Sequence, residues 1–231
     1  MATSNPGWNR FKAVAAVFAI AMSVVVLIWQ YQRIDRRHTY RPAADEVVGV
    51  RLGQGITELA PAGQIVVVAF RPVDELDETS AAILRGFKRS VPETRELQHV
   101  SVEEVARLLF GDQNIDPIAE GGMPPQVFDA IVREHAQAAA LVSLAGLPPR
   151  YSQPAYSARQ RPRIGVADVL LLSENAWIHC LKQDLVDFII LPRLDAPIGQ
   201  AGSREKEFSE NFHFVTKQNV GEVSEEYQAI Y

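Results

Sequence analysis

The sequence predicts an α/β fold, with a mostly parallel, doubly wound sheet behind one N-terminal transmembrane helix. Short apolar runs rich in β-branched residues, such as residues 65–70 (IVVVAF), are typical of strands buried on both faces. Capped amphipathic stretches separate these runs, and alternating strands and helices force right-handed crossovers and a parallel sheet. A further apolar run near the N-terminus has the length of a membrane-spanning helix. The predicted parts of the 231-residue chain are a tail (1–12), a transmembrane helix (13–31), a connector (32–62) and a soluble α/β domain (63–231).

The predicted membrane anchor rests on residues 13–29, AVAAVFAIAMSVVVLIW, in which Ser23 is the only polar residue. At about 1.5 Å per residue this run spans roughly 26 Å, and extending it to Tyr31 approaches the ~30 Å hydrocarbon core. A cleaved signal peptide is the alternative, but it needs small residues after the apolar core, where this chain has WQYQRIDRRH. We therefore expect an uncleaved anchor that contacts membrane lipid through residues 13–31.

The membrane side of the soluble domain is left open by two opposing signals. Four arginines come after the apolar run, whereas one arginine and one lysine precede it, and this count favours a cytoplasmic domain. Against this, a short basic tail before an apolar helix is the usual shape of a bacterial signal anchor, which exports the domain on its C-terminal side. The expectation is a single-pass protein of a bacterial-type inner (plasma) membrane with an extracytoplasmic domain.

Five or six strands, with helices on both faces, account for the soluble domain. The predicted strands are residues 65–70, 96–100, 139–144, 164–169, 186–191 and 212–216. The predicted helices are residues 77–89, 101–111, 124–135, 173–181 and 222–230. Each of the first four helices has a reason to start where it does: Asp77 and Ser173 are N-cap residues, Ser101 and Glu104 form a capping box, and prolines 124–125 suit a first turn.

Three segments lack a periodic apolar pattern. Residues 32–62 are charged at the start and punctuated by glycine and proline, with at most a short strand at 47–52 (VVGVRL). Residues 147–163 (LPPRYSQPAYSARQRPR) contain four prolines and four arginines, which predicts an exposed loop. This loop is either a contact surface for a protein partner or an anion, or a solvated insertion. Residues 195–210 are also expected to be a loop.

Charge and cysteine content exclude several classes of function. Residues 1–41 contain six Lys/Arg and one Asp/Glu, and the rest of the chain contains 17 and 27, so the soluble domain is acidic. An acidic domain repels phosphate backbones, and we predict no nucleic-acid partner. The single cysteine, Cys180, excludes an intramolecular disulfide and a Cys-rich zinc site, and is expected to be a small buried apolar residue.

No catalytic signature is found in the sequence. Gly53 and Gly55 begin like a dinucleotide-binding loop, but Glu58 occupies the position of the third glycine and the segment precedes a strand. Ser143 follows a strand, as a nucleophile elbow would, yet lacks the flanking glycines. The five histidines are not at metal-ligand spacing. We predict no catalytic residue, metal or cofactor, and a non-enzymatic protein is favoured without excluding an enzyme.

Topology alone supplies candidate ligand contacts, because ligands of parallel α/β sheets bind at the carboxyl ends of the strands. The candidates are therefore polar residues that come directly after predicted strands. They are Arg71, Asp74, Ser143, Asp168 and Arg193. An alternative for Asp74 is that it belongs to an acidic run favouring the positive end of the next helix.

Four stretches of the soluble domain carry a resemblance to a known family. They are IVVVAF with AAILRGFKRSVPE, HAQAAALVSLAG, RIGVADV with LKQDLVDFIILPR, and FHFVTKQNVGEV. Over residues 63–223 the chain resembles type I periplasmic binding proteins, which include extracytoplasmic sugar receptors. The resemblance implies a flavodoxin-like or periplasmic-binding-protein-like lobe, export, and binding of a sugar-like small molecule. The chain is shorter than the two-lobed family, so we expect a single lobe or a truncated form.

The sequence supports three functional hypotheses. The leading one is a membrane-anchored, non-enzymatic α/β domain that acts in protein interaction or assembly, because the parallel-sheet pattern is intact and no catalytic signature accompanies it. The second is a membrane-tethered small-molecule binding module related to type I periplasmic binding proteins. The third is a hydrolase or transferase with a divergent site. A protein partner is expected under the first hypothesis and a small-molecule ligand under the second.

Overall fold

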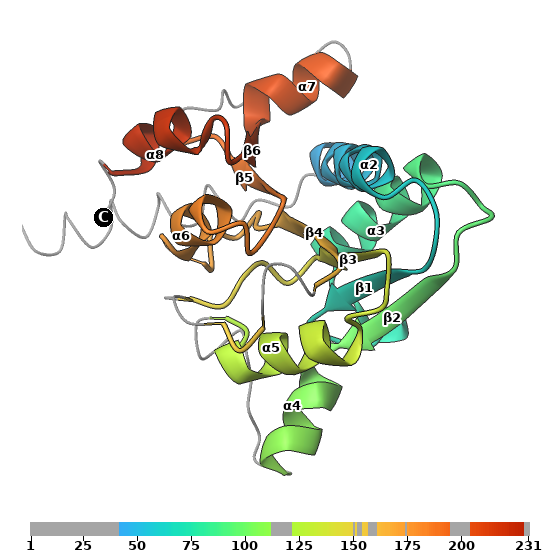
Figure 1. Ribbon diagram of the computed structural model, residues 1–231. Coiled ribbons are helices and arrows are strands. Elements are labelled where there is room, and N and C mark those ends of the chain that lie inside the picture. The colour runs from blue at the N-terminus through green and yellow to red at the C-terminus, as the bar shows by residue number, and fades with distance from the viewer. Residues whose placement is uncertain are drawn as a thin grey trace, which may run out of the picture. The chain divides into compact units, whose positions relative to one another are not determined.

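The computed structural model describes residues 42–111, 122–149, 151, 154–156, 161–173, 175–194 and 204–228. They form a six-stranded sheet in the order β2-β1-β3-β4-β5-β6, with helices on both faces (Figure 1). The strands are β1 (Ile65–Ala69), β2 (Leu97–Ser101), β3 (Ala140–Ser143), β4 (Arg163–Ala167), β5 (Phe188–Pro192) and β6 (Phe212–Thr216). Neighbouring strands are parallel except for the antiparallel pair β5–β6. The predicted mostly parallel α/β fold is confirmed.

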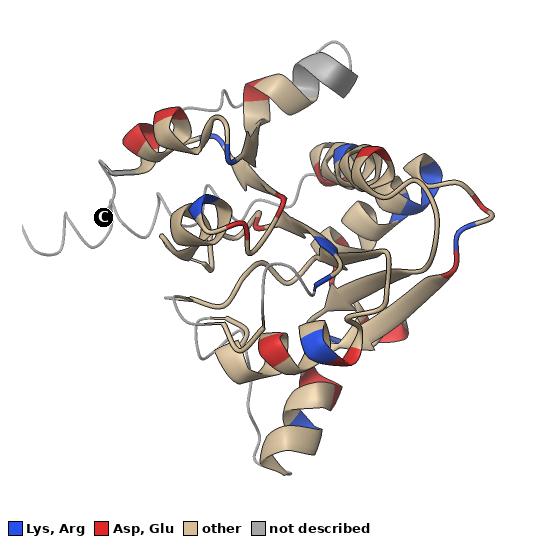
Figure 2. Cartoon of the chain, in the orientation of Figure 1, with Lys and Arg blue, Asp and Glu red and all other residues tan. Residues whose placement is uncertain are grey.

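The sheet separates two apolar cores. One face is covered by α2 (Pro42–Leu59), α3 (Glu78–Ser90) and α7 (Arg204–Asn211), and the other by α4 (Val102–Phe110), α5 (Pro125–Glu134), α6 (Ala176–Lys182) and α8 (Val220–Gln228). The short 3-10 helix η1 (Val73–Glu75) follows β1. Within β1, Val66 and Val68 enter one core while Ile65 and Val67 enter the other. Charged residues lie on the helices and loops around a largely uncharged sheet (Figure 2).

The predicted transmembrane helix, residues 13–31, lies outside the described residues. In the part of the chain that the structure describes, no helix combines the length and the apolar character needed to cross a bilayer.

Helix α2 differs from the connector and short strand expected within residues 32–62. It packs along α3, and glycines allow the two backbones to approach closely. A Cβ atom built on Gly49 would lie 1.9 Å from the Ile83 carbonyl oxygen, and one built on Gly86 would lie 1.9 Å from that of Glu46. Glycines that suggested an irregular segment therefore serve helix packing.

The proline-rich segment 147–163 is less exposed than predicted. Tyr151 and Tyr156 are 1% and 9% exposed and belong to the core on the α5 face. The Tyr151 hydroxyl donates to the buried carboxylate of Asp129, which also accepts from the Ala155 amide at 3.1 Å. The prediction of an exposed loop is wrong for these tyrosines, because each ring packs into the apolar core while its hydroxyl donates to a buried acceptor.

Two smaller expectations also differ from the structure. Ser173 does not cap α6, since its hydroxyl donates to Asp168 and the N-cap residue is Asn175. The segment 195–210, expected to be a loop, ends in helix α7. Cys180 is fully buried as predicted, and burial raises the pKa of its thiol to about 12.

Candidate ligand-binding site

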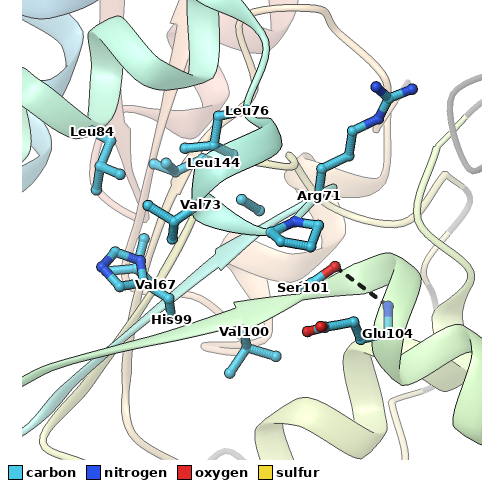
Figure 3. Close-up of a pocket in the computed structure, with 12 residues that line it drawn as sticks. Val67, Arg71, Val73, Leu76, Leu84, His99, Val100, Ser101, Glu104 and Leu144 are labelled. Carbon is cyan, nitrogen blue, oxygen red and sulfur yellow. Dashed lines mark hydrogen bonds between the residues drawn. The ribbon is translucent and has the colours of Figure 1, made fainter.

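A cavity of about 160 Å³ lies at the carboxyl ends of β1 and β2, beneath the connection from β1 to α3. Its apolar wall comes from both strands, η1, α3 and the residue after β3. The apolar wall residues are Val67, Ala69, Pro72, Val73, Leu76, Leu84, Val100 and Leu144. Its polar groups are Arg71, His99, Ser101 and Glu104 (Figure 3).

Strand register brings the polar groups of β2 into this cavity. In the parallel pairing of β1 with β2, Val67 lies opposite His99 and Ala69 lies opposite Ser101. Since side chains alternate between the two faces of a strand, these four residues share the face covered by α3. The imidazole of His99 and the hydroxyl of Ser101 therefore lie on the side of β2 that α3 covers, at the carboxyl edge of the sheet.

Ser101 joins the end of β1 to the start of α4. Its hydroxyl accepts from the Glu104 amide at 3.3 Å, which confirms one half of the predicted capping box, whereas the Glu104 side chain does not bond back to Ser101. The hydroxyl also donates to the Phe70 carbonyl oxygen at 3.3 Å. The Glu103 amide donates to the same carbonyl at 3.1 Å. Two amides of the first turn of α4 therefore have partners already, so this helix start offers little to an anion.

The ionisable groups around the cavity are of opposite sign. Glu104 extends its carboxylate toward the cavity, whereas Arg71 extends outward so that its guanidinium lies at the rim (Figure 3). Neither side chain forms a hydrogen bond or ion pair with a described residue. Burial lowers the pKa of His99, and the positive charge of Lys88 lowers it further. His99 is therefore neutral near pH 7, and the polar groups present both donors and acceptors.

The five residues singled out from the sequence are not gathered at one place. Arg71 lines the cavity, and Asp74 lies exposed in η1 without lining it. Ser143 is fully buried, and its hydroxyl donates to the Gly146 carbonyl at 2.7 Å. Arg193 follows β5, and its amide donates to the carbonyl of the residue before β6 at 2.7 Å. A ligand-binding role for these residues stays a prediction.

Asp168 closes the turn after β4 from inside the protein. It is 1% exposed and accepts from the amides of Leu172 at 2.9 Å and Ser173 at 3.1 Å, and from the Ser173 hydroxyl. Burial raises the pKa of this carboxyl, and the bonds from Ser173 and Leu172 partly offset the rise. Gly146, with φ of +70°, lies against it, because a Cβ there would be 2.8 Å from Asp168 Oδ1. Asp168 and Ser143 therefore both lie beside Gly146. Ser143 stabilises the turn after β3, and Asp168 stabilises the turn after β4.

Sequence reasoning missed His99, Ser101 and Glu104 as cavity residues. A signal for Glu104 was present: the capping box places it in the first turn after a strand, at the carboxyl edge where ligands bind. His99 depends on which strand β2 pairs with, and that information is not local to the sequence.

A second cavity, of about 310 Å³, lies at the opposite edge of the sheet, between the end of α2, the start of β5 and the end of β6. Its floor is the stacked ring pair Phe188–Phe214, with centroids 4.7 Å apart. Its ionisable groups are largely engaged, since Asp187 pairs with Arg161 and Asp184 pairs with Lys217. Among the described residues, no three His, Cys, Asp or Glu side chains are placed to hold a metal ion.

No family model and no curated protein matches the chain. Solved structures that match include the XylFII–LytSN complex (TM-score 0.46, 12% identity, 75% of this chain and 60% of that one). They also include AraP, an arabinose-binding protein of Geobacillus stearothermophilus (0.45, 9%, 77% and 62%), and a periplasmic sugar-binding protein of Legionella pneumophila (0.41, 14%, 64% and 49%). The chain spans less than two thirds of each of these proteins. The second and third of these are sugar-binding proteins, the kind that the sequence resembles, but with TM-scores below 0.5 they carry no inference about this chain's ligand.

Proposed function

We propose that this chain is a small-molecule binding module whose ligand is a small, neutral, polyhydroxylated compound such as a monosaccharide. The observation that carries the proposal is the cavity at the carboxyl ends of β1 and β2, which combines apolar walls with Arg71, His99 and Glu104. Parallel α/β sheets bind their ligands at this edge. The volume is below the ~300–1,000 Å³ of pockets for drug-sized molecules, which limits the ligand to a small one.

The chemistry of the lining favours a neutral ligand. The carboxylate of Glu104 and the guanidinium of Arg71 have opposite charges, so a charged ligand would be attracted by one group and repelled by the other. A sugar hydroxyl both donates and accepts, and therefore suits a carboxylate, a guanidinium and a neutral imidazole alike. The C–H faces of a sugar ring are apolar and match the valine and leucine walls.

Binding is tested by calorimetric titration with a panel of pentoses and hexoses that includes arabinose. Glu104→Gln is expected to weaken binding roughly tenfold or more, since a hydrogen bond to a charged group contributes about 1.5–3 kcal/mol. Glu103→Gln is the matched control: Glu103 is on the same turn of α4 but pairs with Arg107 at the surface, at 2.9 Å. No binding by any sugar, or equal losses in both variants, would defeat the proposal.

We further propose that residues 13–31 tether the module to a bacterial-type inner membrane, with the domain on the extracytoplasmic side. The support is the uncharged apolar run and its basic N-terminal flank. Protease added to intact spheroplasts should degrade residues 41–231, whereas an intact domain that is cleaved only after lysis would reverse the assignment. Release of the chain by alkaline carbonate would argue against the tether.

Protein interaction is the second candidate function, and the exposed apolar end of α4 favours it. Leu108, Leu109 and Phe110 are 86%, 48% and 37% exposed. Contiguous exposed apolar side chains are typical of interaction sites. A partner identified by mass spectrometry with the wild-type chain should be lost with Leu108→Ser. Unchanged recovery would count against this surface. The segment 147–163 is a poorer candidate for this contact surface, because Tyr151 and Tyr156 anchor it in the core.

A further inference from the structure

The two edges of the sheet are closed to different degrees. At the β6 edge, the Thr216 amide donates to Asn219 Oδ1 at 2.7 Å, and Asn219 Nδ2 donates to the Phe214 carbonyl at 3.0 Å. The Arg193 amide bonds to Asn211, which indicates that Phe214 and Thr216 face away from β5. One asparagine side chain thus bonds to two of the outward groups of β6 and covers this part of the edge.

The β2 edge has no such closure within the described part of the chain. β2 pairs with β1 only, and it forms the margin of the sheet in Figure 1. The Ile65 amide donates to the Glu96 carbonyl at 2.9 Å, so the even-numbered residues of β2 bond to β1. The amides and carbonyls of Leu97 and His99 therefore point outward, toward the position of a further strand.

β2 also lacks the devices that usually keep an edge strand from pairing. Natural edges carry lysine, proline, a bulge or a covering element. The sequence of β2 is LQHVS, without a lysine, arginine, aspartate, glutamate or proline, and the strand is uncharged along its length in Figure 2. Its register with β1 runs without a bulge from Leu97 to Ser101. The outward amides and carbonyls of β2 are spaced to bond with another extended strand, so a strand is the partner that this edge accepts.

We propose that β2 pairs antiparallel with β2 of a second copy of this chain, about a two-fold axis at Gln98. In this register Leu97 of each copy pairs with His99 of the other, and the outward amides and carbonyls of both residues form four hydrogen bonds. The two Gln98 side chains face each other on one side of the joined sheet and are able to bond through their amides. Leu97 packs beside His99 of the second copy on the opposite side.

Self-pairing suits this strand because its register brings no like charges together. Glu96 of one copy meets Val100 of the other, and the centre of the contact is neutral. A two-fold contact that uses the same patch twice is the commonest closed assembly, and it leaves neither β2 edge open. An unrelated strand could make the same backbone bonds, but without the paired glutamines at the axis.

The full-length chain, in detergent and without sugar, tests the pairing through Gln98→Cys. Residues facing each other across the axis in a pair without hydrogen bonds have Cα atoms about 4.5 Å apart, within the range for a disulfide. Oxidation should link two copies roughly tenfold or more faster than in the control Gln54→Cys, a glutamine exposed on α2. Both variants retain Cys180, which burial protects.

Two variants at His99 identify the backbone contact. His99→Pro, added to Gln98→Cys, removes an outward amide that β1 does not use, and should bring cross-linking down to the control rate. His99→Ala keeps the amide and should cross-link as fast as the parent. Equal rates for Gln98→Cys and Gln54→Cys overturn the proposal, as does undiminished cross-linking in a His99→Pro variant with a native circular dichroism spectrum. If His99→Pro does not fold, the first comparison decides alone. Because sugar is absent, the outcome is independent of the proposed ligand.

Discussion

The contact between α2 and α3 gives the sharpest stability prediction. We expect Gly86→Ala to lower the free energy of unfolding of residues 41–231 by about 2 kcal/mol. A Cβ on Gly86 would lie 1.9 Å from the Glu46 carbonyl oxygen and 3.0 Å from the Val50 amide nitrogen. Both atoms belong to the backbone of α2, so no side-chain rotation relieves the clash. The helices must move apart by about 1 Å before the first distance reaches 3.0 Å, the shortest that real contacts show.

The magnitude comes from two opposing terms. Alanine is favoured over glycine within a helix by about 1 kcal/mol, which acts against the clash. Overpacking costs about 1–3 kcal/mol or more, and a gap of 0.5–1 Å along a packed interface forfeits a quarter to a half of its dispersion energy. The interface includes the fully buried side chains of Leu52, Ile83 and Phe87. The second term exceeds the first, so the net effect is destabilising.

Urea unfolding followed by circular dichroism measures the change, with Gly221→Ala as the control. Gly221 is in the first turn of α8, and a Cβ there would meet nothing within 4 Å. That substitution should leave stability unchanged or raise it by up to about 1 kcal/mol. A Gly86→Ala domain as stable as the wild type would refute the idea that glycine is needed for this close approach.

Three further predictions concern charged groups. Arg161→Ala should cost about 3 kcal/mol in urea unfolding, because its side chain is 4% exposed and pairs with Asp187 at 2.6 Å. Arg163→Ala, whose side chain is 56% exposed although it reaches the same carboxylate, should cost less than about 1 kcal/mol, and equal losses would contradict this ranking. Burial raises the pKa of Asp168 above its value in the unfolded chain, so the folded state binds the proton more tightly. The contribution of Asp168 to stability is therefore lost as the pH rises from the unfolded pKa through the folded pKa. The difference between wild type and Asp168→Asn, measured from pH 3 upward, should show that slope, and an opposite slope would exclude it. Burial and the charge of Lys88 lower the pKa of His99, so an NMR titration should find this pKa below the usual value of 6.5. The contribution of His99 to stability should then be lost as the pH falls below 6.5. A measured pKa at or above 6.5 would show that the imidazole is not held in the cavity.

The strands were predictable from the sequence because a strand that is buried on both faces consists of consecutive apolar residues. All five residues of β1 and all four of β3 are buried, and uninterrupted apolar runs indicate such strands. Helix starts were predictable for the same reason: Asp77 accepts from the Ser80 amide at 2.9 Å, within three residues of itself. Such interactions need no knowledge of the rest of the fold.

The features that were not predictable depend on contacts between distant segments. Glycine is a helix breaker when only propensity is considered, but Gly49 is required where α2 meets Ile83, a neighbour far along the chain. Tyr151 was placed on an exposed loop because its acceptor, Asp129, lies 22 residues away on α5. The place of His99 in the cavity was not predictable for the same reason, since it reaches the cavity only through the register of β2 with β1.

His99 also connects the two proposals, because its imidazole lines the cavity while its amide faces the open edge of β2. In the proposed pairing, Leu97 of the second copy packs beside that imidazole and restricts its rotamers. Ordering a side chain before a ligand arrives saves about 0.5–1.5 kcal/mol, so the linked dimer should bind sugar roughly two- to tenfold more tightly than the monomer. Coupling of this kind is reciprocal, and sugar should therefore favour the dimer by the same factor for each copy that binds it, or by the square of that factor when both copies are occupied. Calorimetry on the Gln98→Cys chain, oxidised and then reduced, measures the difference directly. Equal affinities in the two states would show that the edge and the cavity act independently.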